Sequence, residues 1–227
     1  ENLNRFADKT SAREAAIEAG VPVVPGSDGP LTTSEDVVKF VEGIGLPVII
    51  KASMGGGGKG MRVVQRMEDL VSLFESASSE ALASFGDGSV FIERFVDRPR
   101  HIEVQVIGDG TGNVVHLWER DCSIQRRHQK VIEMAPAFTL PMDLREQLQQ
   151  YAVKLTSAAK YKNAGTVEFL VDSELRPYFI EVNPRIQVEH TVTEEVTGID
   201  LVQAQLKIAA GASLEEAGLI QENISAR

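Results

Sequence analysis

Residues 48–64 read Val-Ile-Ile-Lys-Ala-Ser-Met-Gly-Gly-Gly-Gly-Lys-Gly-Met-Arg-Val-Val, a glycine-rich loop between two runs of β-favouring residues. Two known phosphate-binding loops do not fit, because each opens a helix, whereas residues 61–64 have the composition of a strand. A glycine hairpin between two strands brings its backbone amides close to phosphate oxygens and can move as a flap. The alternative interpretation is a flexible surface hairpin that binds nothing.

Lys51 follows the apolar run Val48–Ile50 and precedes the glycine loop by two residues. This position predicts an ammonium group inside a cleft, where a point charge and a glycine lid together suit phosphate transfer. A strand-end lysine that extends to water is the alternative. The loop and the lysine together favour nucleotide binding.

The rest of the chain alternates helical and extended patterns around this loop. Period and capping predict helices over 9–20, 34–44, 67–85, 141–161 and 193–211. Strands are predicted at 48–50, 61–65, 90–95, 102–106, 113–118, 165–171 and 178–183. We therefore expect an α/β chain of two subdomains that face one another across a cleft.

Composition narrows the function classes. The 227 residues carry 23 basic and 33 acidic side chains, a formal net charge of −10, which argues against binding to nucleic acid or to an anionic membrane surface. No apolar run approaches the length of about 20 residues that a membrane-spanning helix needs. The single cysteine, Cys122, excludes an internal disulfide and fits a reducing compartment.

A predicted hairpin carries two acidic residues in its strands. If the hairpin turns at Glu174 and Leu175, Glu168 faces Glu181 and Thr166 faces Asn183. Two opposed carboxylates destabilise a strand pair unless a cation lies between them, and Mg²⁺ accepts one or two protein carboxylates. The alternative is a solvated acidic face, but the apolar neighbours of these residues favour a metal site.

Two polar segments flank this hairpin in sequence. Residues 120–130 are basic in an otherwise acidic chain, and strand alternation would place His128 and Lys130 on one face; a solvated edge strand is the alternative. Alternation also places Arg185, Gln187 and Glu189 on one side of an extended segment after the hairpin. A guanidinium, an amide and a carboxylate could hold a small planar anion and remove its proton.

Taken in order, these segments resemble the ATP-grasp region of biotin carboxylases, and within that family most closely that of the pyruvate carboxylases. The matching stretches are residues 48–60, Pro-Arg-His-Ile-Glu-Val-Gln at 99–105, Glu-Arg-Asp-Cys-Ser-Ile-Gln-Arg-Arg-His-Gln-Lys at 119–130, Gly-Thr-Val-Glu-Phe-Leu at 165–170 and Ile-Glu-Val-Asn-Pro-Arg-Ile-Gln-Val-Glu-His at 180–190. The wording Glu-Val-Asn-Pro-Arg and His-Thr-Val-Thr-Glu-Glu indicates the pyruvate carboxylases.

The resemblance implies an α/β (α+β) ATP-grasp fold, in which a small glycine-flap lid packs over a larger mixed or antiparallel sheet and ATP lies in the cleft. Residues 1–22 would be a linker helix from a missing N-terminal domain. Residues 23–95 would form the lid, and 96–227 the larger subdomain, truncated before the C-terminal part of a biotin carboxylase. We therefore expect the isolated chain to bind Mg-ATP weakly and to have little or no turnover.

The reaction implied by the resemblance is ATP-dependent carboxylation of biotin N1, with Mg²⁺ or Mn²⁺ as metal and carboxyphosphate as intermediate. Lys130, Arg185 and Glu189 would be catalytic, with Glu189 as the base that deprotonates bicarbonate. Gln187 and Val188 would complete the pocket for bicarbonate and biotin, and Glu168, Glu181 and Asn183 would bind the metal. ATP would contact Lys9, Lys51, Gly56, Gly57, Gly58, Gly60, Met61, Glu93, Arg94, Val96, His101, Gln125, His128 and Leu170.

The resemblance also implies partners: a biotin carrier and a carboxyltransferase domain in a parent chain that forms a homo-oligomer. The compartment would be the cytoplasm, with the mitochondrial matrix as the alternative. Another ATP-grasp carboxylate–amine ligase, a carbamoyl-phosphate-synthetase-like domain and a non-catalytic nucleotide-binding module remain alternative functions. A protein kinase is excluded, because the sequence has neither His-Arg-Asp nor Asp-Phe-Gly.

Overall fold

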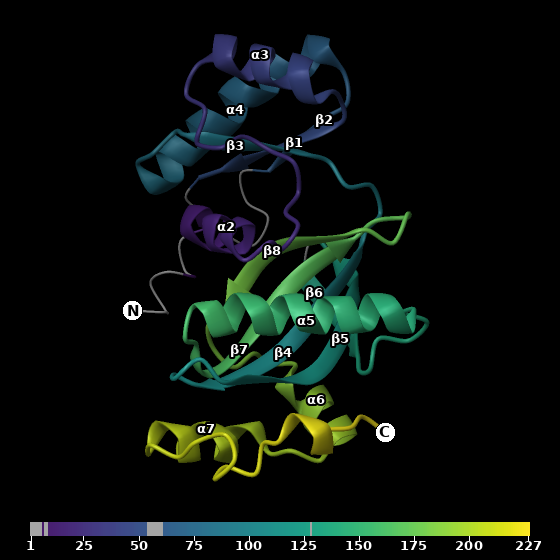
Figure 1. Ribbon diagram of the computed structural model, residues 1–227. Coiled ribbons are helices and arrows are strands. Elements are labelled where there is room, and N and C mark those ends of the chain that lie inside the picture. Colours follow the sequence, from purple (N-terminus) through teal and green to yellow (C-terminus); the bar gives the residue numbers. More distant parts are fainter. Residues whose placement is uncertain (1–5, 7–8, 54–60, 128) are drawn as a thin grey trace. The chain divides into compact units, whose positions relative to one another are not determined.

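The computed structural model describes residue 6 and residues 9–53, 61–127 and 129–227 (Figure 1). The chain divides into two compact units. One unit comprises residues 24–97 and 126–129, and the other comprises residues 1–23, 98–125 and 130–227. Across the part of the chain that is described, no helix has the length and apolar character needed to cross a membrane.

The smaller unit is built on a three-stranded antiparallel sheet in the order β2-β1-β3. Its strands are β1 (Val48–Ala52), β2 (Arg62–Val64) and β3 (Val90–Arg94), and its helices are α3 (Ser34–Ile44) and α4 (Met67–Phe85). Val48 pairs with Val64, so the two strands that flank the glycine loop form the predicted hairpin. The loop residues 54–60 themselves lie outside the described residues. Both helices pack on this sheet, around a core that includes Val37, Ile50 and Phe74.

Both helices of this unit agree with their predicted bounds, and local chemistry explains why. The Thr33 hydroxyl accepts a hydrogen bond from the backbone N–H of Asp36 and caps the start of α3. At its other end, α4 stops at Gly86, whose φ of 77° lies in the left-handed region that glycine adopts at low cost.

The larger unit is built on a five-stranded sheet in the order β6-β5-β4-β7-β8. Its elements are α2 (Lys9–Glu18), β4 (Arg100–Asp109), β5 (Val114–Arg126), β6 (Gln129–Met134), α5 (Met142–Ala158), β7 (Lys162–Val171), β8 (Pro177–Asn183), α6 (His190–Thr197), α7 (Leu201–Ala209) and the 3-10 turn η1 (Gln221–Asn223). Helices α2 and α5 share one apolar core with β4, β7 and β8, and α7 packs on the other face of the sheet (Figure 1).

A β-bulge in β5 decides which of its side chains face which core. Val104 pairs with Glu119, but Val106 pairs with His116, so β5 contains one extra residue at this point, and Trp118 has a φ of 63°. Leu117 faces the α7 core. Because of the bulge, Glu119 turns to the α5 side, where Arg145 binds it, and Arg120 turns to the opposite face.

The β7–β8 hairpin confirms the predicted pairing of the polar residues. Glu168 pairs with Glu181, and Thr166 pairs with Asn183. The register that a turn at Glu174 and Leu175 predicts does not hold along the whole hairpin, because it shifts by one residue after Glu168 and Phe169 pairs with Phe179. This shift is a β-bulge next to the candidate metal residues, a common position for such features.

Three further sequence-based expectations need correction. The helix predicted over 193–211 is two helices, α6 and α7, separated at Gly198, which has a φ of 70°. Residues 120–130 are not one strand but the end of β5 and the start of β6, and β5 is longer than predicted. Residues 184–189 are not a strand but an irregular segment that leads into α6.

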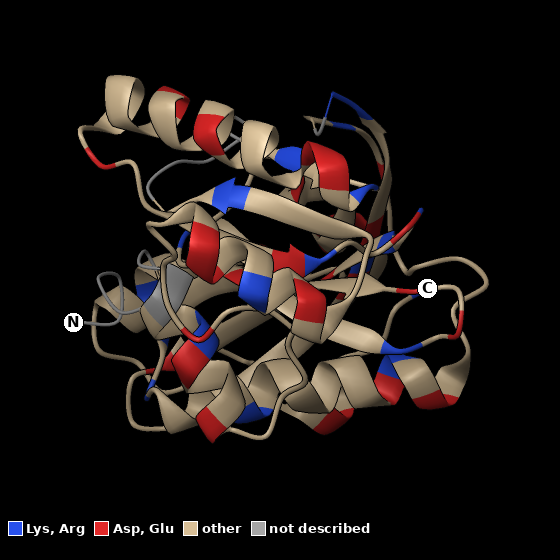
Figure 2. Cartoon of the chain, turned by 90° about the horizontal axis from the view of Figure 1, so that it is seen from above, with Lys and Arg blue, Asp and Glu red and all other residues tan. Residues whose placement is uncertain are grey.

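In the view of Figure 2, the Lys and Arg residues of the described part of the chain are interspersed with Asp and Glu over the helices and strands. The chain carries 33 acidic and 23 basic side chains, so acidic positions outnumber basic ones.

Gly108 offers a test of the packing at the end of β4. A Cβ added there would lie 2.3 Å from the backbone oxygen of Tyr161, which a side-chain movement cannot relieve. We expect Gly108→Ala to lower the free energy of unfolding by about 1–3 kcal/mol, measured by urea denaturation. Gly43→Ala is the matched control: it lies in α3 with no described atom within 4 Å of the added Cβ and should stabilise by about 0.5–1 kcal/mol. Equal effects of the two substitutions would contradict this packing.

Candidate functional site

A row of charged side chains crosses four neighbouring strands of the larger unit. The Cα register pairs Arg120 on β5 with Glu103 on β4, Glu103 with Glu168 on β7, and Glu168 with Glu181 on β8. Directly opposed carboxylates repel one another, so three adjacent glutamates require cations nearby. Arg120 and Lys130 supply them, both within 2.5 Å of Glu103 oxygens.

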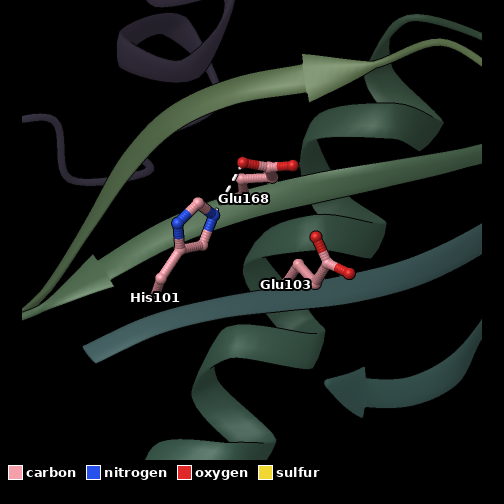
Figure 3. Close-up of side chains that lie close together, drawn as sticks. All are labelled: His101, Glu103 and Glu168. Atoms are coloured by element: carbon pink, nitrogen blue, oxygen red, sulfur yellow. Dashed lines mark hydrogen bonds and ion pairs between the residues drawn. The ribbon is translucent and has the colours of Figure 1, made fainter. Parts of the chain in front are cut away.

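Glu168 lies at the centre of this row and is almost fully buried. Its Oε2 atom lies 2.7 Å from Nε2 of His101 (Figure 3). Its Oε1 atom accepts hydrogen bonds from Asn183 (2.8 Å), Lys130 (3.0 Å) and Gln187 (3.2 Å). Burial alone would raise the pKa of Glu168, but the hydrogen bond with His101 and the ammonium of Lys130 hold this pKa well below its ordinary value.

His101 is held in one orientation by its two ring nitrogens. The amide nitrogen of Gln125 donates to the carbonyl of Cys122 at 2.8 Å and contacts Nδ1 of His101 at 2.9 Å. Because an amide N–H is a donor, Nδ1 accepts and the proton of the neutral ring is on Nε2, which donates to Glu168. Leu170 on β7 pairs with His101 on β4, on the same face of the sheet.

Lys130 at the start of β6 touches three carboxylates. Its Nζ atom lies 2.5 Å from Glu103, 2.7 Å from Glu189 and 3.0 Å from Glu168. Burial opposes the charged form of Lys130, but Glu103 and Glu168 raise its pKa above the ordinary lysine value. Burial likewise opposes ionisation of Glu189, and the hydrogen bond from Lys130 lowers the pKa of this carboxyl. Both groups are therefore charged at neutral pH.

The oxygen donors of this cluster fit a hard divalent cation. The amide nitrogen of Asn183 lies 2.8 Å from Glu168 and 3.5 Å from Glu181, so the three predicted metal residues are neighbours. Carboxylates are the protein ligands that Mg²⁺ and Mn²⁺ prefer. The cluster holds four glutamates, Glu103, Glu168, Glu181 and Glu189, but only two cationic side chains, those of Arg120 and Lys130. The difference is two negative charges, which one divalent ion would balance.

Two other groups of potential ligands occur among the described residues. His101, Glu103 and Glu168 each offer an atom within 4.8 Å of the others, and so do Glu103, Cys122 and Glu189. The first group shares Glu168 with the predicted metal residues (Figure 3). The second includes the soft thiol of Cys122, which is not a ligand that Mg²⁺ or Mn²⁺ prefers.

The structure brings some of the predicted anion-binding residues together and separates others. Gln187 and Glu189 both reach the cluster, through Glu168 and Lys130. Arg185 does not join them: its side chain is exposed, and its Nη1 donates to the carbonyl of Ile186. The side chain of Val188 is 90% exposed. The predicted strand alternation fails here because residues 184–189 form no strand.

The smaller unit holds most of the remaining predicted nucleotide residues. Nζ of Lys51 lies 2.5 Å from Glu93, which joins β1 to β3, and the lysine side chain is 30% exposed. Arg94 is exposed, while Met61 and Val96 are partly buried. Outside the described residues lie Gly56, Gly57, Gly58, Gly60, His128 and the side chain of Lys9.

Sequence patterns did not single out the buried residues that organise this cluster. Arg120 and Glu103 are fully buried and joined by a 2.5 Å ion pair. Gln105, Thr166 and Thr193 are also buried, and each accepts a hydrogen bond from Arg120. For the residues of β4, β5 and β7, the signal that could have found them is a charged or polar residue at an inward position of a core strand, whereas Thr193 lies in α6.

Three comparisons relate the chain to known proteins. A family model described as carbamoyl-phosphate synthase L chain, ATP binding domain, matches residues 8–217. A pyruvate carboxylase of Aspergillus terreus is 60% identical over all 227 residues, which span 19% of that protein. The chain therefore covers about a fifth of the length of this curated relative.

Solved structures of biotin carboxylases are also similar. The Campylobacter jejuni biotin carboxylase, in a complex with a β,γ-ATP ligand, has a TM-score of 0.92 and 51% identity over 98% of this chain and 49% of that one. The biotin carboxylase domain of a Hydrogenobacter thermophilus 2-oxoglutarate carboxylase, in complex with MgADP, ADP and bicarbonate, has a TM-score of 0.92 and 47% identity. These figures cover 99% of this chain and 49% of that one.

The lowered pKa values of Glu168 and Glu189 predict an acid-sensitive fold. Their ionised forms stabilise the folded state above the unfolded pKa of 4.5, and this contribution is lost as the pH falls through the lower folded values. We expect the free energy of unfolding, measured by urea denaturation from pH 7 to pH 3, to fall by roughly 1–3 kcal/mol from this source. Glu168→Gln should flatten this dependence, whereas Glu146→Gln, at an exposed position of α5, should not. An unchanged slope in Glu168→Gln would contradict the assignment.

Proposed function

Because the chain belongs to the family of carbamoyl-phosphate synthase L chain ATP-binding domains, we propose that it is the ATP-binding part of a biotin-dependent carboxylase of the pyruvate carboxylase type. Its reaction would be the carboxylation of biotin N1 by bicarbonate at the expense of Mg-ATP. The observation that carries this proposal is the contact of Lys130 with both Glu168 and Glu189, the carboxylates to which we assign metal binding and proton abstraction.

The metal half of the proposal rests on Glu168, Glu181 and Asn183. These residues would hold Mg²⁺ or Mn²⁺, which would neutralise charge on the ATP phosphates. His101 and Gln125 keep Glu168 oriented and would lie near the ribose and phosphates. Lys9, Lys51 and the glycine loop would contact the phosphates, and His128 would lie near the ribose and phosphates. The adenine would contact Met61, Glu93, Arg94 and Val96, and Leu170 would be a further ATP contact.

The bicarbonate half of the proposal rests on Lys130, Gln187 and Glu189. The ammonium of Lys130 would bind the anion and keep Glu189 ionised, so that this carboxylate can accept the bicarbonate proton. A carbonate oxygen would then bond to the γ-phosphorus of ATP as the bond to ADP breaks, giving carboxyphosphate. The exposed guanidinium of Arg185 would stabilise developing negative charge, and Val188 would contact biotin.

A second candidate function is carbamoyl-phosphate synthesis or another carboxylate–amine ligation, which the description of the family model favours. The two functions differ in the acceptor. ATP hydrolysis that free biotin stimulates and ammonia does not would support the carboxylase, and the reverse result would support the ligase. Mg-ATP binding with neither stimulation would support a non-catalytic nucleotide-binding module.

We also propose the setting of this reaction. The carboxyl acceptor would be biotin on a carrier domain, which would deliver the carboxyl group to a carboxyltransferase domain in a homo-oligomeric parent protein. The single buried cysteine fits a reducing compartment, the cytoplasm or the mitochondrial matrix.

Removal of one proposed metal ligand tests nucleotide binding. We expect Glu168→Gln to weaken Mg-ATP binding at least tenfold, because the variant loses a carboxylate charge at the metal while keeping the size of the side chain. Isothermal titration calorimetry of the chain with ATP, with and without Mg²⁺, measures this. The control is Glu146→Gln, which should bind like the wild type. Equal affinities of wild type and Glu168→Gln would contradict the metal assignment.

Removal of the proposed base tests the chemistry separately. We expect Glu189→Gln to reduce bicarbonate-dependent ATP hydrolysis at least 100-fold in the full-length protein, since an amide cannot accept the bicarbonate proton. The affinity for Mg-ATP should stay within threefold of wild type. Hydrolysis assays with and without bicarbonate and free biotin measure the first effect, and calorimetry the second. Retained bicarbonate dependence would rule out Glu189 as the base.

A further inference from the structure

Arg120 is a buried cation with an unusually complete set of partners. Its side chain has no exposed surface, and all three nitrogens of its guanidinium donate hydrogen bonds. Nε donates to Glu103 at 2.5 Å, and the acceptors of Nη1 and Nη2 are Gln105 (2.9 Å), Thr193 (2.8 Å), Thr166 (3.3 Å) and Gln187 (3.3 Å). A charge buried this deeply is costly unless such partners compensate it.

Two of these partners continue directly into the candidate site. Glu103 binds Arg120 through Oε1 and Lys130 through Oε2, at 2.5 Å each. Gln187 accepts from Arg120 through its amide oxygen and donates to Glu168 through its amide nitrogen at 3.2 Å. Arg120 is thus connected to Lys130 through Glu103 and to Glu168 through Gln187.

The donor and acceptor roles in this network allow one arrangement. A guanidinium only donates and an ionised carboxylate only accepts, so the amide of Gln187 must direct its oxygen at Arg120 and its nitrogen at Glu168. Gln105 is fixed in the same way, between Arg120 and the carbonyl of Gly165. In this way Arg120 determines the orientation of an amide that faces the proposed bicarbonate position.

We propose that Arg120 is a positioning residue for the anion half of the site. It fixes Lys130 through Glu103, and it fixes the amide of Gln187. This inference rests on the proposed function. The planar guanidinium of Arg120 has five N–H groups and reaches Glu103, Gln105 and Gln187 together. A lysine cannot replace it, because a single ammonium group cannot contact all three. Glu168 keeps its contacts with His101 and Asn183 whether residue 120 is arginine or lysine. The substitution should therefore change Mg-ATP binding little.

The test compares Arg120→Lys with Arg145→Lys in the full-length protein. Arg145 is a matched control, because it also pairs with a buried glutamate of β5, Glu119, at 2.7 Å, but on the opposite side of the sheet. For Arg120→Lys we expect kcat/KM for bicarbonate to fall at least tenfold while the Kd of Mg-ATP stays within threefold. For Arg145→Lys both values should stay near wild type even if its melting temperature falls.

A double-mutant cycle shows whether Arg120 acts through its partner. The effects of Arg120→Lys and Glu103→Gln on kcat/KM for bicarbonate should be strongly non-additive, since both break one chain of contacts. If Arg120→Lys does not fold, as judged by circular dichroism, Thr193→Val removes one bond to the guanidinium and should raise the KM for bicarbonate two- to fivefold.

The outcomes separate the two proposals. Wild-type protein without bicarbonate-dependent turnover would overturn the proposed function and this inference with it. If the wild type turns over and Arg120→Lys turns over equally fast, the positioning role alone is overturned. The same holds if Arg120→Lys and Arg145→Lys both lose bicarbonate turnover and Mg-ATP binding to the same extent. An unchanged KM in Thr193→Val would do the same if that variant is the one that folds.

Discussion

The arrangement of charged residues in the larger unit depends on one constraint: the adjacent glutamates of the five-stranded sheet need cationic side chains beside them. Three glutamates stand side by side on β4, β7 and β8, in a face where burial raises the cost of every uncompensated charge. Arg120 and Lys130 meet this cost from β5 and β6. Because Glu103 pairs with both Arg120 and Lys130, the fully buried part of the network and its more accessible part are connected.

Small irregularities of the sheet make this compensation geometrically feasible. The bulge near Trp118 reverses the side-chain alternation of β5, so that Arg120 faces the glutamates while its neighbour Glu119 pairs with Arg145 on the α5 side. A second bulge follows Glu168 in the hairpin. Without the first bulge, Arg120 would face the α5 core, and Glu103 would lose its buried partner.

The network also divides the site into parts with different tasks. His101 and Asn183 orient the oxygens of Glu168, as the proposed role of this residue in binding a metal would require. Lys130 links this residue to Glu189, and the pKa shifts of both groups keep them charged. The ionised carboxylate is the form of Glu189 that can accept a proton from an anion bound at the same ammonium. This division supports the proposed carboxylation.

The sequence alone determined the helices α3 and α4 with their bounds, the existence of the two hairpins and the pairing of Glu168 with Glu181, because period, capping and turn residues act over a few neighbours. It also placed Lys130, Gln187 and Glu189 among the candidate residues. Only the tertiary structure decided that Arg120 and Glu103 form the buried link between them, and that Arg185 lies apart. A one-residue bulge reverses the direction of every following side chain, and strand alternation read along a sequence cannot detect it.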